Sequence, residues 1–213
     1  MPAHTGVESS PLSRRAFVGA AAGAAASLLV GRARAEDTFV VGLVLPPASD
    51  AGALEQGARL GLEEANALAT LFGKRLRMES ETAADAGAAG RAATAMVRAG
   101  ALALVGGAGN GYADALRDAA ATGNALFLNT AARDDRLRQE RCDKHTFHVI
   151  PGITMYVDAL AQWAASRQLM RWAIFGDGTP RAQEVEAAVR RALTRHAGAS
   201  LAADRSSADL LIL

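Results

Sequence analysis

Short apolar runs and amphipathic stretches alternate along the chain from about residue 36 to its end. Runs such as residues 38–45 and 101–105 are rich in Val, Leu and Ala, which is typical of strands buried on both faces of a parallel sheet. Stretches such as residues 51–70 repeat apolar positions every three or four residues, which predicts helices. The expected strands are residues 38–45, 74–79, 101–105, 125–128, 146–150, 171–175, 200–203 and 209–213, and the expected helices are residues 51–70, 86–99, 112–121, 153–167 and 180–196.

This alternation predicts an α/β fold, in which a parallel sheet is flanked by helices and joined by right-handed crossovers. Pro151 interrupts the series, so we divide the chain into an N-terminal α/β lobe, residues 36–145, and residues 146–213, a hinge strand followed by part of a second α/β lobe. The last apolar run stops inside a strand of the buried type, which would leave an unpaired edge. We therefore expect the second lobe to be incomplete and the sequence to be either a fragment or the product of an interrupted gene.

The first 35 residues have the three parts of an export signal. Arg14 and Arg15 precede a soft apolar run, and Ala33 and Ala35 form a small-x-small cleavage pattern. The paired arginines indicate the twin-arginine (Tat) route. The apolar run is mostly Ala and Gly and is shorter than the roughly 20 residues of a spanning helix. We predict a signal peptide over residues 1–35 and a periplasmic mature chain without stable membrane insertion; a retained membrane anchor is the alternative.

Composition excludes several classes of partner. The chain has 23 Lys and Arg against 22 Asp and Glu, a balance that argues against nucleic acid. Cys142 is the only cysteine, so no intramolecular disulfide can form, and we expect it to be a small buried side chain. His145 and His148 fall on opposite faces of an expected strand, so the sequence predicts no metal site.

Candidate binding residues follow the strands, because ligands of open parallel sheets bind beyond the carboxyl ends of the strands. The glycine-rich loop after residues 101–105 exposes backbone N–H groups next to a helix N-terminus, which favours an anionic group such as a carboxylate. A glycine-rich turn without a ligand is the alternative. The candidate ligand contacts are Ser49, Gly107, Ala108, Gly109, Asn110, Asn129 and Thr130.

The sequence lacks a convincing catalytic set. The glycines have the wrong spacing for a dinucleotide fingerprint, and there is neither a Walker lysine nor a Gly-x-Ser-x-Gly elbow. Asp134 and Asp135 are adjacent carboxylates in a charged segment, residues 131–144, which we expect to be a surface excursion with solvated or capping acids. Asp177 fits ordinary turn chemistry, and Trp163 and Trp172 are expected in the core of the second unit. We therefore predict that the protein is not an enzyme and carries no cofactor.

Several segments, in their order and spacing, resemble a type 1 periplasmic substrate-binding protein of the branched-chain amino-acid (leucine/isoleucine/valine) receptor group. They are FVVGLVLPPAS, QGARLGLEEANAL, ALALVGGAG, ALFLNTAA, FHVIPG and RWAIFGDGTPRAQ. The resemblance spans about residues 38–213. More narrowly, residues 129–163 resemble binding proteins associated with PQQ-dependent alcohol dehydrogenase systems, in which an Asp-Asp, a lone Cys and a Phe-His-x-x-Pro stretch recur.

The resemblance implies a soluble periplasmic receptor that traps a small solute between two lobes by hinge closure and serves an ABC permease or a periplasmic dehydrogenase. The amino-acid receptors usually have Ser or Thr in the loop occupied here by residues 107–110, which contains neither. A second hypothesis is therefore an interaction module for a dehydrogenase or regulator that binds no solute. Because much of the second lobe is missing from this chain, we expect it to bind solutes weakly or not at all.

Overall fold

A five-stranded sheet forms the centre of the first lobe. The computed structural model describes residues 37–47, 51–109, 111–195 and 198–212. Within these ranges the first sheet has the strand order β2-β1-β3-β4-β5, and every neighbouring pair is parallel. Its strands are β1 (Asp37–Leu45), β2 (Lys74–Thr82), β3 (Ala101–Gly106), β4 (Leu126–Asn129) and β5 (Thr146–His148). The predicted α/β class and parallel pairing are confirmed.

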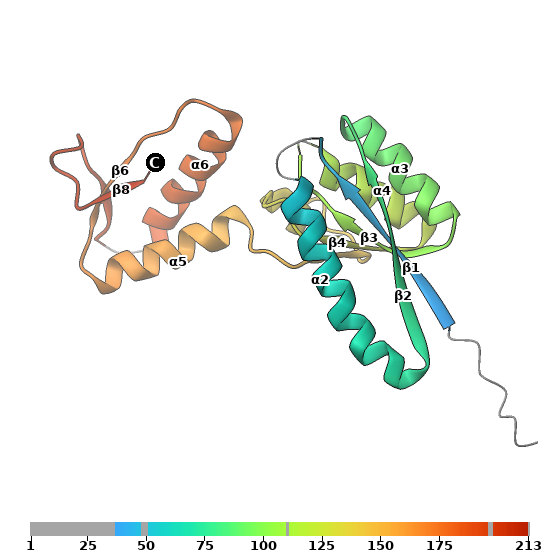
Figure 1. Ribbon diagram of the computed structural model, residues 1–213. Coiled ribbons are helices and arrows are strands. Elements are labelled where there is room, and N and C mark those ends of the chain that lie inside the picture. Colours follow the sequence, from blue (N-terminus) through green and yellow to red (C-terminus); the bar gives the residue numbers. More distant parts are fainter. Residues whose placement is uncertain (1–36, 48–50, 110, 196–197, 213) are drawn as a thin grey trace, which may run out of the picture. The chain divides into compact units, whose positions relative to one another are not determined.

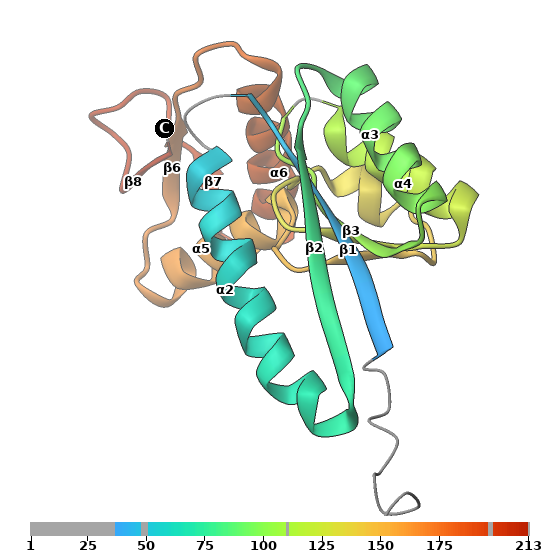
Figure 2. The same ribbon diagram turned by 45° about the vertical axis from the view of Figure 1, so that its right-hand side comes forward.

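Helices cover both faces of this sheet. They are α2 (Ala51–Ala69), α3 (Ala86–Arg98) and α4 (Tyr112–Gly123), with two short 3-10 turns, η1 (Thr70–Phe72) and η2 (Asp135–Arg138). Helices α3 and α4 lie side by side on one face, and α2 lies on the other face beside β1 and β2 (Figure 1; Figure 2). The strand order reverses between β1 and β3, so the carboxyl ends of these two strands flank the crevice where such sheets bind ligands.

The hydrophobic core of this lobe lies between the sheet and the α3–α4 pair. Leu104 of β3, Leu116 of α4 and Phe127 of β4 are fully buried there. The helices present mainly alanines to this core, which lets their backbones approach the strands closely. Gly42 in β1 serves the same purpose, because a Cβ at this position would stand 2.6 Å from the sulfur of Met96. Small residues on both sides therefore set the distance between sheet and helices.

The opposite face is covered less completely. Helix α2 has no buried residue. On β5, Phe147 pairs in register with Leu128 and therefore faces away from α4, where it is 53% exposed; Val149, two residues on, is 67% exposed. The sequence predicted helices on both faces but not how little of the α2 face is buried, since the alternation of elements does not reveal how much area each covers.

Residues 153–212 form a second α/β unit. Its sheet has the order β7-β6-β8 and is parallel, and α5 packs against α6. The elements are α5 (Ile153–Ser166), β6 (Arg171–Ile174), α6 (Pro180–Arg195), β7 (Ser200–Leu201) and β8 (Leu210–Ile212). The fully buried Trp172 lies in its core, as predicted. The prediction for Trp163 is wrong, because this side chain is 48% exposed and lies off the apolar face of α5.

Two further predictions concern the termini and the cysteine. The signal-peptide residues Arg14, Arg15, Ala33 and Ala35 lie outside the described residues. Among the residues that the structure does describe, no helix is both long and apolar enough to cross a bilayer. Cys142 is exposed, so the prediction that it is buried is wrong. It sits in a surface turn in which its N–H donates to the carbonyl oxygen of Gln139 (3.1 Å).

Candidate functional site

The glycine-rich loop leaves the sheet at the carboxyl end of β3 and leads directly into α4. Its backbone has positive φ at Gly106, Gly107, Gly109 and Gly111. The first residue of α4, Tyr112, is buried, and its hydroxyl donates a 2.7 Å hydrogen bond to the carbonyl oxygen of Ala83, just after β2. Burial raises the pKa of Tyr112 and the charge of Asp85 adds to the effect, so the phenol keeps the proton that makes this bond. The N-terminus of α4 is thereby tied to the end of a neighbouring strand.

Gly107 lies close to the end of β4. Its φ is 104°, and a Cβ on it would stand 2.9 Å from Oδ1 of Asn129. Both the left-handed backbone and the lack of space require glycine here. The loop therefore runs beside the end of β4 with no side chain of residue 107 between them. Its backbone remains accessible from the cavity at the strand ends.

Thr130 follows β4 and is bonded to the glycine loop. Its backbone N–H and its hydroxyl both donate to the carbonyl oxygen of Gly106, at 3.0 Å and 3.2 Å. With its proton used in this way, the hydroxyl oxygen retains lone pairs that can accept a hydrogen bond. Thr130 thus offers an acceptor to a ligand, beside the donors of the glycine loop.

Asn129 does not act as an open contact. Its side chain is fully buried, and Oδ1 accepts the N–H groups of Ala132 (2.8 Å) and Ala131 (3.3 Å). Its amide nitrogen donates to the carbonyl oxygen of Ala132 (2.7 Å) and lies 3.0 Å from Nδ1 of His148. We correct the expectation that Asn129 faces a ligand: its polar atoms are engaged in shaping the loop that follows β4.

A cavity of about 800 Å³ brings the other predicted residues together. Gly107, Ala108, Gly109 and Thr130 all line it. Ser49 and Asn110, the remaining predicted contacts, lie outside the described residues. Six charged residues of opposite signs also line the cavity, namely Asp114, Arg133, Asp134, Arg136, Arg181 and Glu184. Their presence suits a small polar or zwitterionic molecule better than a purely apolar one.

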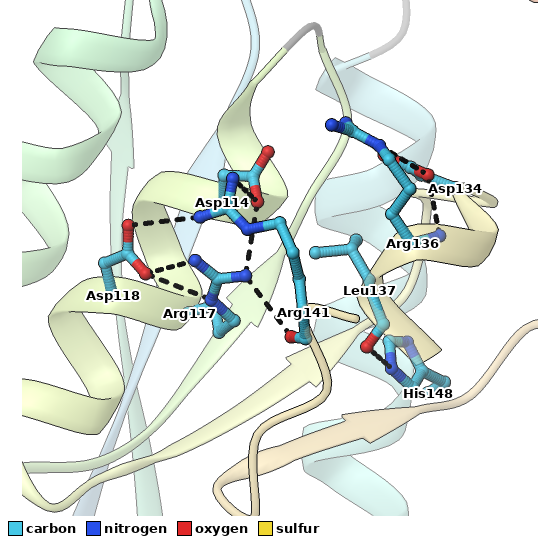
Figure 3. Close-up of polar contacts among 8 residues, drawn as sticks. All are labelled: Asp114, Arg117, Asp118, Asp134, Arg136, Leu137, Arg141 and His148. Carbon is cyan, nitrogen blue, oxygen red and sulfur yellow. Dashed lines mark hydrogen bonds and ion pairs between the residues drawn. The ribbon is translucent and has the colours of Figure 1, made fainter. Parts of the chain in front are cut away.

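Arg133, Asp134 and Arg136 were not expected in the wall of the cavity, because the charges of residues 131–144 predicted a surface excursion. In the structure, the segment is anchored to the lobe by Leu137, which is buried in the core beside α4. Asp134 caps η2 by accepting the N–H of Arg136 (2.9 Å) and pairs with its guanidinium (Figure 3). Burial acts to raise the pKa of Asp134, but the hydrogen bonds and charge of Arg136 outweigh it, and the pKa is lowered. The sequence signal that could have indicated a charged cavity wall was the set of arginines, Arg133, Arg136 and Arg138, soon after the end of β4.

An ion-pair network holds the far end of this segment against α4 (Figure 3). Arg117 is nearly buried, donates to the carbonyl oxygen of Arg141 (3.3 Å) and pairs with Asp118 and Asp114. The Arg141 guanidinium also reaches Asp114, at 3.1 Å. The network therefore fixes both the charged segment and the first turn of the helix that begins at the glycine loop.

Other candidates for chemistry have structural partners. Asp135 accepts the N–H (3.0 Å) and hydroxyl (2.6 Å) of Thr154, and Asp177 accepts the N–H (3.0 Å) and hydroxyl (2.7 Å) of Thr179 at the start of α6. These are the capping and turn roles that the sequence predicted for them. Across the described ranges, no group of three or more His, Cys, Asp or Glu is arranged to hold a metal ion.

Solved structures share this fold. An ABC transporter substrate-binding protein from Desulfitobacterium hafniense matches 78% of this chain and 49% of its own, at 18% identity and a TM-score of 0.68. A leucine-binding protein from Thermotoga maritima matches 77% of this chain and 48% of its own, at 16% identity and a TM-score of 0.59. A solute-binding protein from Rhodopseudomonas palustris BisB5, in complex with 3,4-dihydroxybenzoic acid, matches 83% and 47%, at 18% identity and a TM-score of 0.63.

The chain thus spans about half the length of the solved structures that it resembles. No curated protein sequence gives a significant match. The family model described as periplasmic binding protein matches residues 39–209, which include both sheets. The chain therefore belongs to the periplasmic binding protein family, with the type 1 fold of the leucine-binding-like substrate-binding proteins of ABC transporters.

Proposed function

We propose that this chain is the periplasmic solute-binding component of an ABC-type uptake system and acts as a receptor, without catalysis. The observation that carries the proposal is the cavity at the carboxyl ends of β3 and β4, where Gly107, Ala108, Gly109 and Thr130 lie together. In open parallel sheets, ligands bind outside the carboxyl ends of the strands near the reversal of strand order, and β3 is one of the two strands that flank this reversal. The family to which the chain belongs supports the periplasmic location.

The proposed solute is a small organic molecule with a carboxylate. Backbone N–H groups of the glycine loop and the N-terminus of α4 favour an anion, while the Thr130 oxygen accepts a donor from the same molecule. Among the similar structures, one protein from Streptococcus pneumoniae is in complex with isoleucine and two from Rhodopseudomonas palustris are in complex with hydroxylated benzoic acids. These two ligand classes are therefore the first to test.

Two lobes of a binding protein trap the solute by closing around a hinge, and we assign the hinge here to residues 147–150, which lead from β5 toward α5. Binding energy would select the closed state, which the permease recognises. Delivery to the periplasm would use the Tat signal with Arg14 and Arg15 and cleavage after Ala35. The resemblance of residues 129–163 to binding proteins of PQQ-dependent alcohol dehydrogenase systems supports a link of the receptor to alcohol oxidation.

The second candidate function is an interaction module that binds a periplasmic dehydrogenase or regulator and no solute. It is favoured by the exposed apolar side chains of Phe147 and Val149, and by the lack of any hydroxyl side chain at residues 106–109. Monomeric proteins keep such contiguous apolar surface small.

A thermal-shift screen of the protein against branched-chain amino acids, hydroxybenzoates, short alcohols and PQQ separates the two functions. The receptor predicts a concentration-dependent rise in Tm with at least one solute, and because we expect this chain to bind weakly, the rise should need millimolar solute. No rise with any solute, together with co-purification of a dehydrogenase, would reject the receptor and support the module. A Gly107→Ala variant should lose the ligand-induced rise.

A further inference from the structure

His148 is a half-buried histidine beside the proposed binding loop, and it is not one of the proposed solute contacts. It ends β5, in register with Asn129 at the end of β4. Its two ring nitrogens contact different parts of the lobe. Nδ1 lies 3.0 Å from the amide nitrogen of Asn129. Nε2 lies 3.3 Å from the carbonyl oxygen of Leu137 (Figure 3). The ring therefore connects the loop after β4 with η2.

The hydrogen bonds around Asn129 determine where the ring proton is. Because Oδ1 of Asn129 accepts two backbone N–H groups, the atom that faces His148 is the amide NH₂, which can only donate. Nδ1 of His148 must then accept, so the neutral ring carries its proton on Nε2. This proton points to the Leu137 carbonyl oxygen, which accepts it. The Nε2–H tautomer therefore satisfies both partners of the ring, the amide of Asn129 and the carbonyl oxygen of Leu137.

From this arrangement we infer that His148 is a positioning residue of the proposed solute site: its neutral Nε2–H form holds Asn129, and through Asn129 the loop that carries Thr130, in the binding conformation. A protonated ring has a donor at Nδ1, which would face the donor NH₂ of Asn129. One of the two must move, and Asn129 then releases Ala131 and Ala132. The inference rests on the proposed function for its link to solute binding, but the link between ring and loop is independent of any solute.

The electrostatic surroundings favour the neutral ring. Burial lowers the pKa of His148, the charge of Arg138 lowers it further, and the Leu137 carbonyl partly opposes both. Arg138, from η2, is held by the carbonyl oxygens of Ile150 (2.5 Å) and Asp134 (3.3 Å), with the carboxylates of Asp134 and Asp135 in its vicinity. On β4 the ring faces the uncharged side chain of Asn129. The pKa of His148 is therefore held below the ordinary histidine value of about 6.5, which favours the neutral ring.

Two substitutions separate the roles of the two nitrogens. In His148→Asn the side-chain oxygen can replace Nδ1 as an acceptor for Asn129, whereas in His148→Gln the amide can replace Nε2 as a donor to Leu137. We expect His148→Asn to keep the loop and remove its pH dependence, and His148→Gln to loosen the loop at every pH. His145→Gln, which removes a neighbouring histidine, is the control and should leave the pH dependence of the loop unchanged.

The test is nuclear magnetic resonance of the isotope-labelled protein between pH 8 and 5, without solute. The expected result is an Nε2–H ring for His148 and amide signals of Ala131 and Ala132 that move with the same midpoint, below pH 6.5. An Nδ1–H ring, or a ring that titrates while these amides stay still, would overturn the inference.

Solute affinity is then measured at the two ends of this range. If only the neutral form binds, each pH unit below the midpoint weakens binding about tenfold. A solute that binds equally well at pH 8 and at pH 5 would contradict the inference about His148 but would leave the proposed receptor function intact. If ring and loop titrate together but no solute binds at any pH, the positioning role of His148 holds and the receptor function fails.

Discussion

Oδ1 of Asn129 lies 2.9 Å from the place that a Cβ on residue 107 would occupy, so Asn129 in this position requires glycine at residue 107. Asn129 in turn accepts the N–H groups of Ala131 and Ala132, which gives the loop after β4 its shape. The two loops that line the cavity are therefore built against each other, through one glycine and one buried amide.

Gly107→Ala tests this contact. The added Cβ meets Asn129, and the backbone at φ 104° is strained for alanine, so the free energy of unfolding should fall by roughly 1–3 kcal/mol. The measurement is urea denaturation followed by circular dichroism. Gly61→Ala is the matched control: Gly61 lies within α2 with open space around it, and alanine there should raise stability by about 0.5–1 kcal/mol. Equal effects of the two substitutions would contradict the account.

Tyr112→Phe removes one buried hydrogen bond and leaves the ring in place. The carbonyl oxygen of Ala83 loses its partner, so the free energy of unfolding should fall by about 1 kcal/mol, with an unchanged urea m-value. Because this bond also holds the first turn of α4, we expect amide hydrogens at the start of α4 to exchange faster in the variant. A variant as stable as the wild type would show that the hydroxyl does not tie α4 to the end of β2.

Arg117→Met tests the ion-pair network on α4. The Arg117 side chain is 9% exposed, and its removal takes away the bond to the Arg141 carbonyl and the pairing with Asp114, so stability should fall by about 2–3 kcal/mol. Asp118→Asn alters the exposed partner, at 64% exposure, and should cost less than about 1 kcal/mol. Chemical denaturation of both variants gives the comparison, and a larger loss for Asp118→Asn would refute the assignment.

The lowered pKa of Asp143 predicts that the free energy of unfolding depends on pH. Its carboxylate accepts the N–H (2.8 Å) of His145 and contacts the ring nitrogen Nδ1 (3.0 Å); the backbone hydrogen bond is the main cause of its lowered pKa. A lowered carboxyl pKa stabilises the native state above about pH 4, and this contribution is lost as the pH falls through the native pKa. Asp143→Ala should therefore cost about 1–2 kcal/mol at pH 7 and progressively less toward pH 3.

The control for Asp143 is the exposed Glu140, whose replacement by alanine should change stability by less than about 0.5 kcal/mol. Denaturation curves at several pH values measure both. A cost of Asp143→Ala that stays constant down to pH 3 would contradict the role of its charge.

Much of the fold could be predicted, because its signals are local. Apolar runs marked the strands, helical periodicity marked the helices between them, and the glycine loop marked the end of β3. The same locality explains the placement of Thr130 beside Gly107, since parallel strands bring their carboxyl ends to one edge.

What could not be predicted depends on distant partners. Asn129 looked like an open polar contact at a strand end, but His148, nineteen residues later, engages its amide. Residues 131–144 looked solvated because they are highly charged, although the buried side chain of Leu137 anchors them in the core. Trp163 was assigned to the core by residue type, whereas the buried positions Val157, Ala161 and Ala164 define a helix face that excludes it.

The central claim is that the loops after β3 and β4 bind a small carboxylate solute. The most direct measurement is a titration of the ¹⁵N-labelled protein with millimolar leucine and, separately, 4-hydroxybenzoate, followed through its backbone amide signals. We predict saturable shifts that centre on Gly107, Ala108, Gly109 and Thr130 with at least one of them, and their loss in Gly107→Ala. Shifts confined to other parts of the chain, or no shifts with either solute, would contradict the claim.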